Sequence, residues 1–180
     1  GYLGLRTKMV KYYAEYGIYL SPDEIIITTG GSEAVLFAFL ACLNPGDEII
    51  VTDPFYANYM AFAISVGAVI KSVKTSIEDG FRLPSIEAFE EQITERTKAI
   101  LICNPNNPTG ALYSDETLKE IVEIARQNEL ILFADEIYDR LVMDGLTHTA
   151  LASLAPDVPC ISFNGLSKSH RVAGFRVGWM

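Results

Sequence analysis

Short apolar runs bounded by turn residues alternate along the chain with longer stretches in which apolar residues recur every three or four positions. The first pattern is typical of buried strands and the second of helices. Their alternation predicts βα units around a mostly parallel sheet. Seven strands are expected, at residues 25–29, 48–52, 68–73, 98–103, 130–134, 160–163 and 175–179.

Helices are expected where the longer stretches end at residues that cannot continue a helix, such as proline and glycine. They are predicted at residues 5–16 before Gly17, 32–43 before Asn44-Pro45-Gly46, 55–66 before Gly67, and 117–128 after a cap at Ser114. A further helix is expected to begin with Pro84 in its first turn.

The predicted strands 98–103 and 130–134 show no polar alternation, which indicates burial on both faces. The fold class expected is therefore α/β, a three-layer α/β/α arrangement around a mostly parallel seven-stranded sheet. In such sheets ligands bind beyond the carboxyl ends of the strands. The residues that follow each strand are thus the first candidates for chemistry.

The composition is that of one globular domain, with 180 residues of which 49% are hydrophobic and 21% charged. A net charge of -9 argues against a nucleic-acid surface and favours a small-molecule partner. The longest apolar stretch, residues 35–43, is far shorter than the roughly 20 residues that cross a bilayer, so no membrane span is expected.

Cys42, Cys103 and Cys160 are scattered, without a CxxC spacing, and the chain has only two histidines. They are interpreted as reduced core residues of a cytosolic protein, and no metal site is expected. The N-terminus lacks a signal-peptide pattern and a starting Met, and the last residues run through an apolar segment, so both ends look cut.

Two candidate contacts for a ligand follow the first two strands. Gly30-Gly31-Ser32 leads directly into a helix, where backbone N–H groups and the helix dipole favour an anion such as phosphate. The same turn could be only a tight connection. Tyr56 could stack on a planar ring or be a core aromatic of the next helix.

The fourth and fifth strands also end in polar residues. The rigid loop at residues 104–110 could aim a side-chain amide, or be a plain turn. Asp135 follows an apolar strand, and a buried carboxylate requires a cation or donors, for which a protonated ring nitrogen is a candidate. The alternative is a helix cap or an exposed strand end.

Lys168 follows the sixth strand among small residues, where a desolvated lysine has a lowered pKa and a nucleophilic amine. An exposed lysine is the alternative. Arg176 could offer a fork of donors to a phosphate or make a surface ion pair.

The order of these motifs resembles that of class I/II aminotransferases, which are fold type I enzymes dependent on pyridoxal 5'-phosphate (PLP). The motifs are Gly-Gly-Ser, Pro-x-Tyr-x-x-Tyr, Asn-Pro-Asn-Asn-Pro-Thr-Gly, Asp-x-x-Tyr and Ser-Lys-(x)7-Arg. The resemblance covers almost the whole chain. Arg171 departs from the usual small residue, yet Asn-Gly-Leu-Ser-Lys and Arg-Val-Ala-Gly-Phe-Arg are similar to bacterial alanine (glutamate-pyruvate) aminotransferases.

The resemblance implies a role for each matched residue. Lys168 would hold PLP as a Schiff base and move the substrate proton, while Asp135 would keep the pyridine nitrogen protonated. The others would be Asn107 and Tyr138 at the phenolic oxygen, Tyr56 on the ring face, Gly31, Ser32, Ser167 and Arg176 at the phosphate, and Gly30 shaping the turn.

The resemblance also implies amino-group transfer between an amino acid and a 2-oxo acid by a homodimer. Residues 1–180 would be the PLP-binding large domain, without the N-terminal segment and C-terminal small domain of the family, so the isolated polypeptide is expected to bind PLP weakly and to transaminate poorly. Two alternatives stay open: a PLP-dependent β-lyase with the same motifs, and a ligand-sensing domain of a transcriptional regulator. The donor amino acid is not indicated by the motifs.

Overall fold

All residues from 1 to 180 are described by a computed structural model, in which the seven expected strands form one sheet. The strand order is β1-β7-β6-β5-β4-β2-β3. The strands are β1 (Ile27–Thr28), β2 (Glu48–Asp53), β3 (Val69–Lys74), β4 (Thr97–Cys103), β5 (Ile131–Asp135), β6 (Cys160–Gly165) and β7 (Gly178–Trp179).

The sheet is mostly parallel, as the alternation of elements predicts. The pairs β2–β3, β2–β4, β4–β5 and β5–β6 are parallel, whereas β7 is antiparallel to both of its neighbours, β1 and β6. The carboxyl ends of six strands therefore lie at one edge of the sheet. The chain that enters β7 arrives at this same edge.

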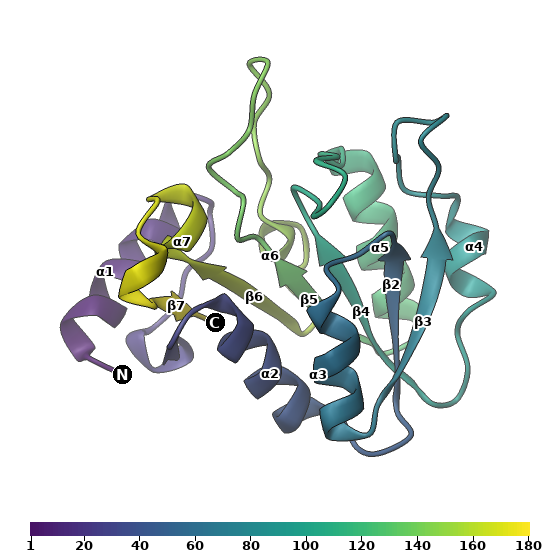
Figure 1. Cartoon of the computed structure of the whole chain (residues 1–180), viewed down its shortest axis with the longest axis horizontal. Coiled ribbons are helices and arrows are strands. Elements are labelled where there is room, and N and C mark those ends of the chain that lie inside the picture. The colour runs from purple at the N-terminus through teal and green to yellow at the C-terminus, as the bar shows by residue number, and fades with distance from the viewer.

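Helices cover both faces of the sheet and make the fold a three-layer α/β/α sandwich (Figure 1). The helices are α1 (Leu3–Ala14), α2 (Gly31–Cys42), α3 (Asn58–Val66), α4 (Ile86–Glu90), α5 (Asp115–Gln127), α6 (Leu151–Leu154) and α7 (Leu166–Ser169), with short 3-10 turns at Pro22–Glu24 and Ala173–Phe175. In Figure 1, α2 and α3 lie in front of the sheet and α5 lies behind it.

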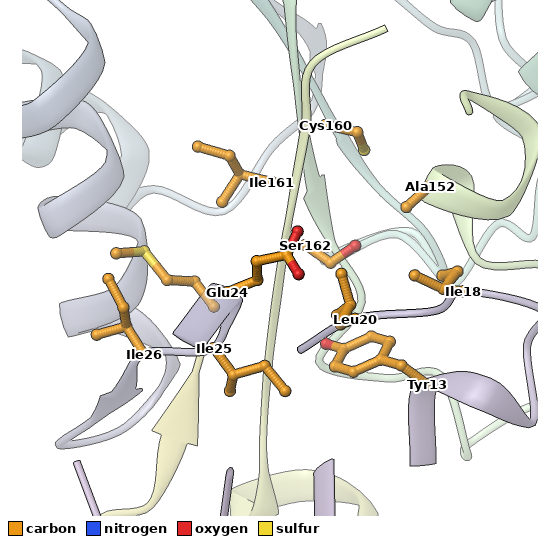
Figure 2. Close-up of a pocket in the computed structure, with 11 residues that line it drawn as sticks. Tyr13, Ile18, Leu20, Glu24, Ile25, Ile26, Ala152, Cys160, Ile161 and Ser162 are labelled. Carbon is orange, nitrogen blue, oxygen red and sulfur yellow. The ribbon is translucent and has the colours of Figure 1, made fainter. Parts of the chain in front are cut away.

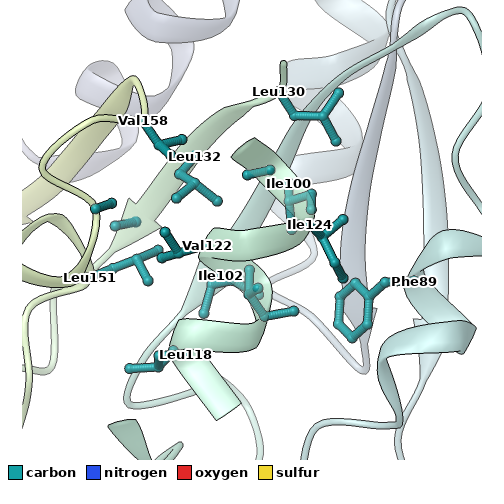
Figure 3. Close-up of a cluster of buried hydrophobic side chains, with 14 of the residues drawn as sticks. Phe89, Ile100, Ile102, Leu118, Val122, Ile124, Leu130, Leu132, Leu151 and Val158 are labelled. Carbon is teal, nitrogen blue, oxygen red and sulfur yellow. The ribbon is translucent and has the colours of Figure 1, made fainter. Parts of the chain in front are cut away.

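The core consists of one apolar cluster on each face of the sheet. Successive residues of β4 alternate between them: Ile100 and Ile102 pack in the cluster beneath α5, whereas Ala99 and Leu101 pack in the cluster beneath α2 and α3. Figure 3 shows the first cluster, with side chains from β4, β5 and α5 pointing toward one another. The prediction that the central strands are buried on both faces is confirmed.

Two of the predicted helix ends are confirmed by their hydrogen bonds. The N–H of Thr117 donates to Ser114 Oγ at 3.3 Å, so Ser114 caps α5. After α1, the Gly17 N–H donates to Ala14 O and the Ile18 N–H donates to Tyr13 O, while Gly17 has a left-handed φ of 75°. This pattern is a Schellman motif, which favours glycine at that position.

Three predicted boundaries are wrong. α3 begins at Asn58, so Phe55 and Tyr56 lie before the helix. α4 begins after Ser85, so Pro84 lies outside its first turn. The last strand is only Gly178–Trp179, because Arg176 has a left-handed φ of 51° that no strand accommodates.

The cysteines are only partly core residues, contrary to the expectation. All three thiols are free; Cys103 is buried, whereas Cys42 and Cys160 are partly exposed. No group of three or more His, Cys, Asp or Glu side chains could hold a metal ion. The helices are all too short or too polar to span a bilayer.

Candidate active site

A polar hollow of about 240 Å³ lies at the edge of the sheet where the six strands end. Nine of the ten residues proposed from the sequence line it: Gly31, Ser32, Tyr56, Asn107, Asp135, Tyr138, Ser167, Lys168 and Arg176. Val35, Ile137 and Ala173 complete the lining. The fold thus brings together residues that are up to 145 positions apart in the sequence.

The tenth residue, Gly30, does not line the hollow, but its backbone lies against the Arg176 guanidinium. Its φ of 95° favours glycine, and a Cβ on Gly30 would lie 2.2 Å from Arg176 Nη2, which is closer than real Cβ contacts. Any side chain at Gly30 would therefore displace the guanidinium. The predicted role of Gly30 in shaping the turn agrees with this geometry.

The end of the hollow near α2 has the properties of an anion site. The first N–H groups of α2, from Gly31 and Ser32, have no acceptor within the helix and carry the positive end of its dipole. Arg176 Nη1 lies 3.5 Å from Ser167 Oγ, and Nη2 lies 3.4 Å from Thr29 O. The guanidinium therefore joins the glycine turn to the segment that carries Ser167.

Gly178 is a site residue that the sequence reasoning missed. A Cβ on Gly178 would lie 2.3 Å from the carbonyl carbon of Gly30 and 2.5 Å from the backbone nitrogen of Gly31. β7 can approach the turn at the start of α2 only because this position has no side chain. The sequence gives no sign of this contact, because Gly178 and Gly30 lie far apart along the chain.

Asp135 is the last residue of β5 and is 8% exposed. It lies between Cys103 of β4 and Phe163 of β6 in the sheet register. Its carboxylate accepts hydrogen bonds from the Tyr59 hydroxyl and, at 3.2 Å, from the Ile137 N–H. Burial raises the pKa of the Asp135 carboxyl, and the bond from Tyr59 opposes that rise.

Tyr59 is the second residue that the sequence reasoning missed as a site residue. Its side chain is 1% exposed, and its ring is stacked with that of Phe55 and lies edge-on to Tyr56, with 5.4 Å between the ring centroids of the two tyrosines. Burial and the neighbouring Asp135 raise the pKa of the Tyr59 hydroxyl well above its usual value. The hydroxyl therefore stays protonated and acts as a donor to Asp135.

Lys168 lies on the short helix α7, and its side chain borders the hollow. Its Nζ lies 5.9 Å from the centroid of the Tyr138 ring. The residue is exposed, so the expected desolvation of the amine is not seen. The reason is geometric: α7 is a single helical turn, and it packs mainly against the short turn Ala173–Phe175.

Tyr56 and Asn107 occupy the remaining wall of the hollow. The Tyr56 hydroxyl accepts a hydrogen bond of 2.7 Å from Asn58 Nδ2. The loop before Asn107 is braced by Asn106, whose Oδ1 accepts from the Thr109 hydroxyl at 2.9 Å and whose N–H donates to Ala111 O. Asn106 therefore fixes the loop, and Asn107 is left to line the hollow.

A second hollow of about 220 Å³ lies at the other end of β6 and is much more apolar (Figure 2). Figure 2 shows Ile18 and Leu20, from the segment before β1, on the same side of β6 as Ser162. Glu24 is its one charged residue. This hollow lacks the convergent cations and donors that a phosphorylated ligand requires.

A candidate anion site, a buried carboxylate and a primary amine lie around one hollow, a set of groups that could hold a phosphorylated ring with a carbonyl group. The sequence profile of the family "Aminotransferase class I and II" matches residues 1–180. The chain belongs to this family.

Curated relatives and solved structures agree with the family match. The chain is 47% identical to the glutamate-pyruvate aminotransferase AlaA of Haemophilus influenzae, over 100% of this chain and 45% of the relative. It is similar to a crystal structure of an aminotransferase from Escherichia coli (TM-score 0.96, 44% identity) and to alanine aminotransferase from Pyrococcus furiosus (TM-score 0.94, 40% identity). Both matches include 100% of this chain. They include 45% of the Escherichia coli chain and 46% of the Pyrococcus furiosus chain. The chain thus spans less than half the length of these relatives.

Proposed function

We propose that residues 1–180 form the PLP-binding large domain of an aminotransferase, which moves an amino group between an amino acid and a 2-oxo acid. The observation that carries this proposal is that Asp135, Lys168 and Arg176 line one hollow. The names of the relatives support it, because those relatives are glutamate-pyruvate and alanine aminotransferases. Glutamate and pyruvate are therefore the first substrates to test.

The residues around the hollow fit the chemical groups of PLP. The phosphate would bind at the start of α2, between Ser32, Ser167 and Arg176, where N–H groups, hydroxyls and a guanidinium converge. The ring nitrogen would face Asp135, whose present donors are both uncharged. Tyr56 would stack on the ring, and Asn107 and Tyr138 would donate to its phenolic oxygen.

Bound PLP supplies an electron sink for the carbanion that forms when the substrate loses its α-proton. The chain's own residues supply the rest. Lys168 Nζ would hold the cofactor and then carry the proton between the substrate Cα and the cofactor. The carboxylate of Asp135 would keep the ring nitrogen protonated, because a buried anion is stabilised by a cation at hydrogen-bond distance.

We further propose that the protein is a homodimer in the cytoplasm. Phe37 and Leu40 of α2 and Met60 and Ile64 of α3 are exposed, and α2 contacts α3. Exposed apolar residues gathered on neighbouring helices fit a protein interface. The three free cysteines fit a reducing compartment. Light scattering on the purified complete gene product tests the dimer.

The test of function uses the complete gene product with PLP, L-glutamate and pyruvate. The expected result is formation of alanine and 2-oxoglutarate in equal amounts, without ammonia. Release of ammonia and pyruvate from a substrate with a leaving group at Cβ, with no amino-group transfer, would instead support a β-lyase. PLP binding without turnover of any amino acid would support a ligand-sensing domain.

A further inference from the structure

A partly buried set of hydrogen bonds lies outside the hollow and joins α1 to the turn after β5 and to β6. The Tyr12 hydroxyl of α1 donates to Asp139 Oδ2 and accepts a hydrogen bond of 3.2 Å from Asn164 Nδ2. Asp139 is 5% exposed and Asn164 is 2% exposed. One hydroxyl thus joins two buried side chains that come from different strand ends.

Each of the two joined residues is close in sequence to a proposed catalytic residue. Asp139 directly follows Tyr138 in the turn after β5, and its N–H donates to Glu136 O at 3.0 Å. Asn164 lies in β6, four positions before Lys168, and its Oδ1 accepts the Gly165 N–H at 2.7 Å. The Tyr12 hydroxyl therefore holds together the segment that carries Tyr138 and the segment that carries Lys168.

The surroundings of Tyr12 keep this hydroxyl protonated and its ring fixed. Burial, followed by the hydrogen bond to Asp139, raises the pKa of Tyr12 above its usual value. The Arg140 guanidinium lies over the ring, with 4.9 Å between its carbon and the ring centroid. Tyr16 lies four residues after Tyr12, just beyond the end of α1, and its hydroxyl also donates to Asp139 Oδ2 at 3.3 Å.

We propose that Tyr12 is a positioning residue, whose hydroxyl sets the relative placement of Tyr138 and Lys168 through Asp139 and Asn164. This proposal rests on the proposed function, because it concerns the residues that would hold PLP. Neither Tyr138 nor Lys168 lies in a long regular element: Tyr138 is in a turn and Lys168 is in a helix of four residues. Their placement therefore depends on side-chain contacts such as this one.

Catalytic groups need placement to within a fraction of an ångström, and an error of about 1 Å can lower the rate about a hundredfold. Tyr12→Phe removes the bridging hydroxyl and keeps the ring under Arg140. We expect kcat for transamination to fall about tenfold to a hundredfold, with a smaller change in KM. We also expect a shifted pH midpoint for the visible absorbance of bound PLP, which reports the environment of Lys168.

The matched control is Tyr13→Phe in the same complete, PLP-loaded protein. Tyr13 is also buried, and its hydroxyl accepts from Trp179 Nε1 at 2.9 Å and makes no hydrogen bond to Asp139 or Asn164. It is expected to lower Tm about as much as Tyr12→Phe while it leaves the absorbance midpoint and kcat unchanged. Asp139→Ala removes the other end of the bridge and should match Tyr12→Phe, whereas Asp139→Asn keeps an acceptor and should restore most of kcat.

The inference is overturned if Tyr12→Phe and Asp139→Ala keep the wild-type midpoint and kcat, or change them no more than Tyr13→Phe does. Should one of the two variants not fold, the other decides the question. Failure of the proposed function looks different: the wild-type protein itself would then show no visible absorbance with PLP. The two failures are therefore distinguished by the wild-type spectrum.

Discussion

Asp135 is the residue at which burial and proposed chemistry are most closely linked. Its carboxyl is almost fully buried at the end of β5, and the cost of that burial raises its pKa. The Tyr59 hydroxyl lowers the cost by donating a hydrogen bond from α3. Tyr59 therefore stabilises the charged form of Asp135, which is the form that would pair with a protonated ring nitrogen.

Tyr59→Phe is expected to weaken PLP binding. Loss of a hydrogen bond to a charged group costs about 1.5–3 kcal/mol, so Kd for PLP should rise about tenfold or more. The pKa of the Asp135 carboxyl should rise as well. As the pH is lowered, the variant should therefore lose PLP at a higher pH than the wild type does. Absorbance titration of the apoprotein with PLP measures both effects.

Tyr13→Phe is the control for this variant, because Tyr13 is also buried but its hydroxyl accepts from Trp179 Nε1 and does not contact Asp135. It should bind PLP as the wild type does. Equal PLP affinities for Tyr59→Phe and the wild type would show that the Tyr59 hydroxyl does not support Asp135.

Glu136, the neighbour of Asp135, predicts a pH dependence of stability. Burial raises the pKa of its carboxyl to about 8, and its Oε1 accepts the Leu151 N–H at 2.8 Å. His148 Nε2 lies 3.8 Å away, but burial lowers the pKa of His148 and so favours its neutral form. Glu136 is therefore expected to be protonated in the folded protein at neutral pH.

The sign of the effect follows from the raised pKa. Between the unfolded pKa of about 4.3 and the folded pKa of about 8, the folded state holds one more proton than the unfolded state. The contribution of Glu136 to stability is thus greatest below the unfolded pKa and decreases as the pH rises toward 8. Glu136→Gln should remove this pH dependence. At pH 8 the free energy of unfolding of the variant should exceed that of the wild type by on the order of a few kcal/mol.

Denaturant unfolding of the wild type and Glu136→Gln from pH 5 to pH 8 measures this difference. The expected gap in free energy of unfolding is small at pH 5 and widens with pH. A gap that is constant across the range would mean that Glu136 does not titrate between the two states.

The sequence indicated the residues with distinctive motifs and missed those whose role is spatial. Lys168, Asp135 and Arg176 are predicted because they belong to motifs whose order along the chain resembles that of class I/II aminotransferases. Tyr59 is the second tyrosine of the Pro-x-Tyr-x-x-Tyr motif, but the sequence indicates no role for it, because its partner Asp135 lies 76 positions away. The same holds for Gly178, whose need for a small residue comes from contact with Gly30.

At the scale of elements, α5 is the helix whose sequence and structure agree best. Ser114 caps it, Asp115 and Glu116 lie in its first turn, and Arg126 lies in its last turn, which suits the helix dipole at both ends. Arg126 also makes a bidentate ion pair with Asp157 at 2.8 Å, which joins the end of α5 to the segment before β6. The buried face of α5 packs against β4 and β5.

Ser114→Ala is expected to lower the free energy of unfolding by about 1 kcal/mol, because it leaves an N–H group of the first turn without its acceptor. Ser114→Asp keeps an acceptor and should stay close to the wild type. Both variants are compared by denaturant unfolding. An unchanged stability in Ser114→Ala would mean that water replaces the cap without cost.

Element prediction succeeded where the hydrophobic pattern was long and failed where pairing or short turns decide the structure. β4 and α5 have patterns of six residues or more, and both were predicted within two residues of their observed ends. α6 and α7 have four residues each, too few to show a period. β1 and β7 were predicted too long because each pairs through only two residues, which no sequence pattern specifies.

At the scale of the whole molecule, the fold collects the ends of six strands and the start of β7 at one edge of the sheet. That arrangement explains why residues from Gly31 to Arg176 share one hollow (Figure 1). The chain spans less than half the length of its curated relatives, and within it Lys168 and Arg176 are exposed. A polypeptide limited to residues 1–180 should therefore bind PLP more weakly than the complete gene product, by absorbance titration.

Lys168 is the amine that we propose to hold PLP. The most direct measurement is borohydride reduction of the PLP-loaded complete protein, followed by peptide mass spectrometry to locate the attached cofactor. We expect the cofactor on the peptide containing Lys168 and none on Lys168→Ala, while a surface control, Lys98→Ala, is labelled at Lys168 as in the wild type. Attachment at another lysine in the wild-type protein, or undiminished attachment in Lys168→Ala, would contradict this proposal.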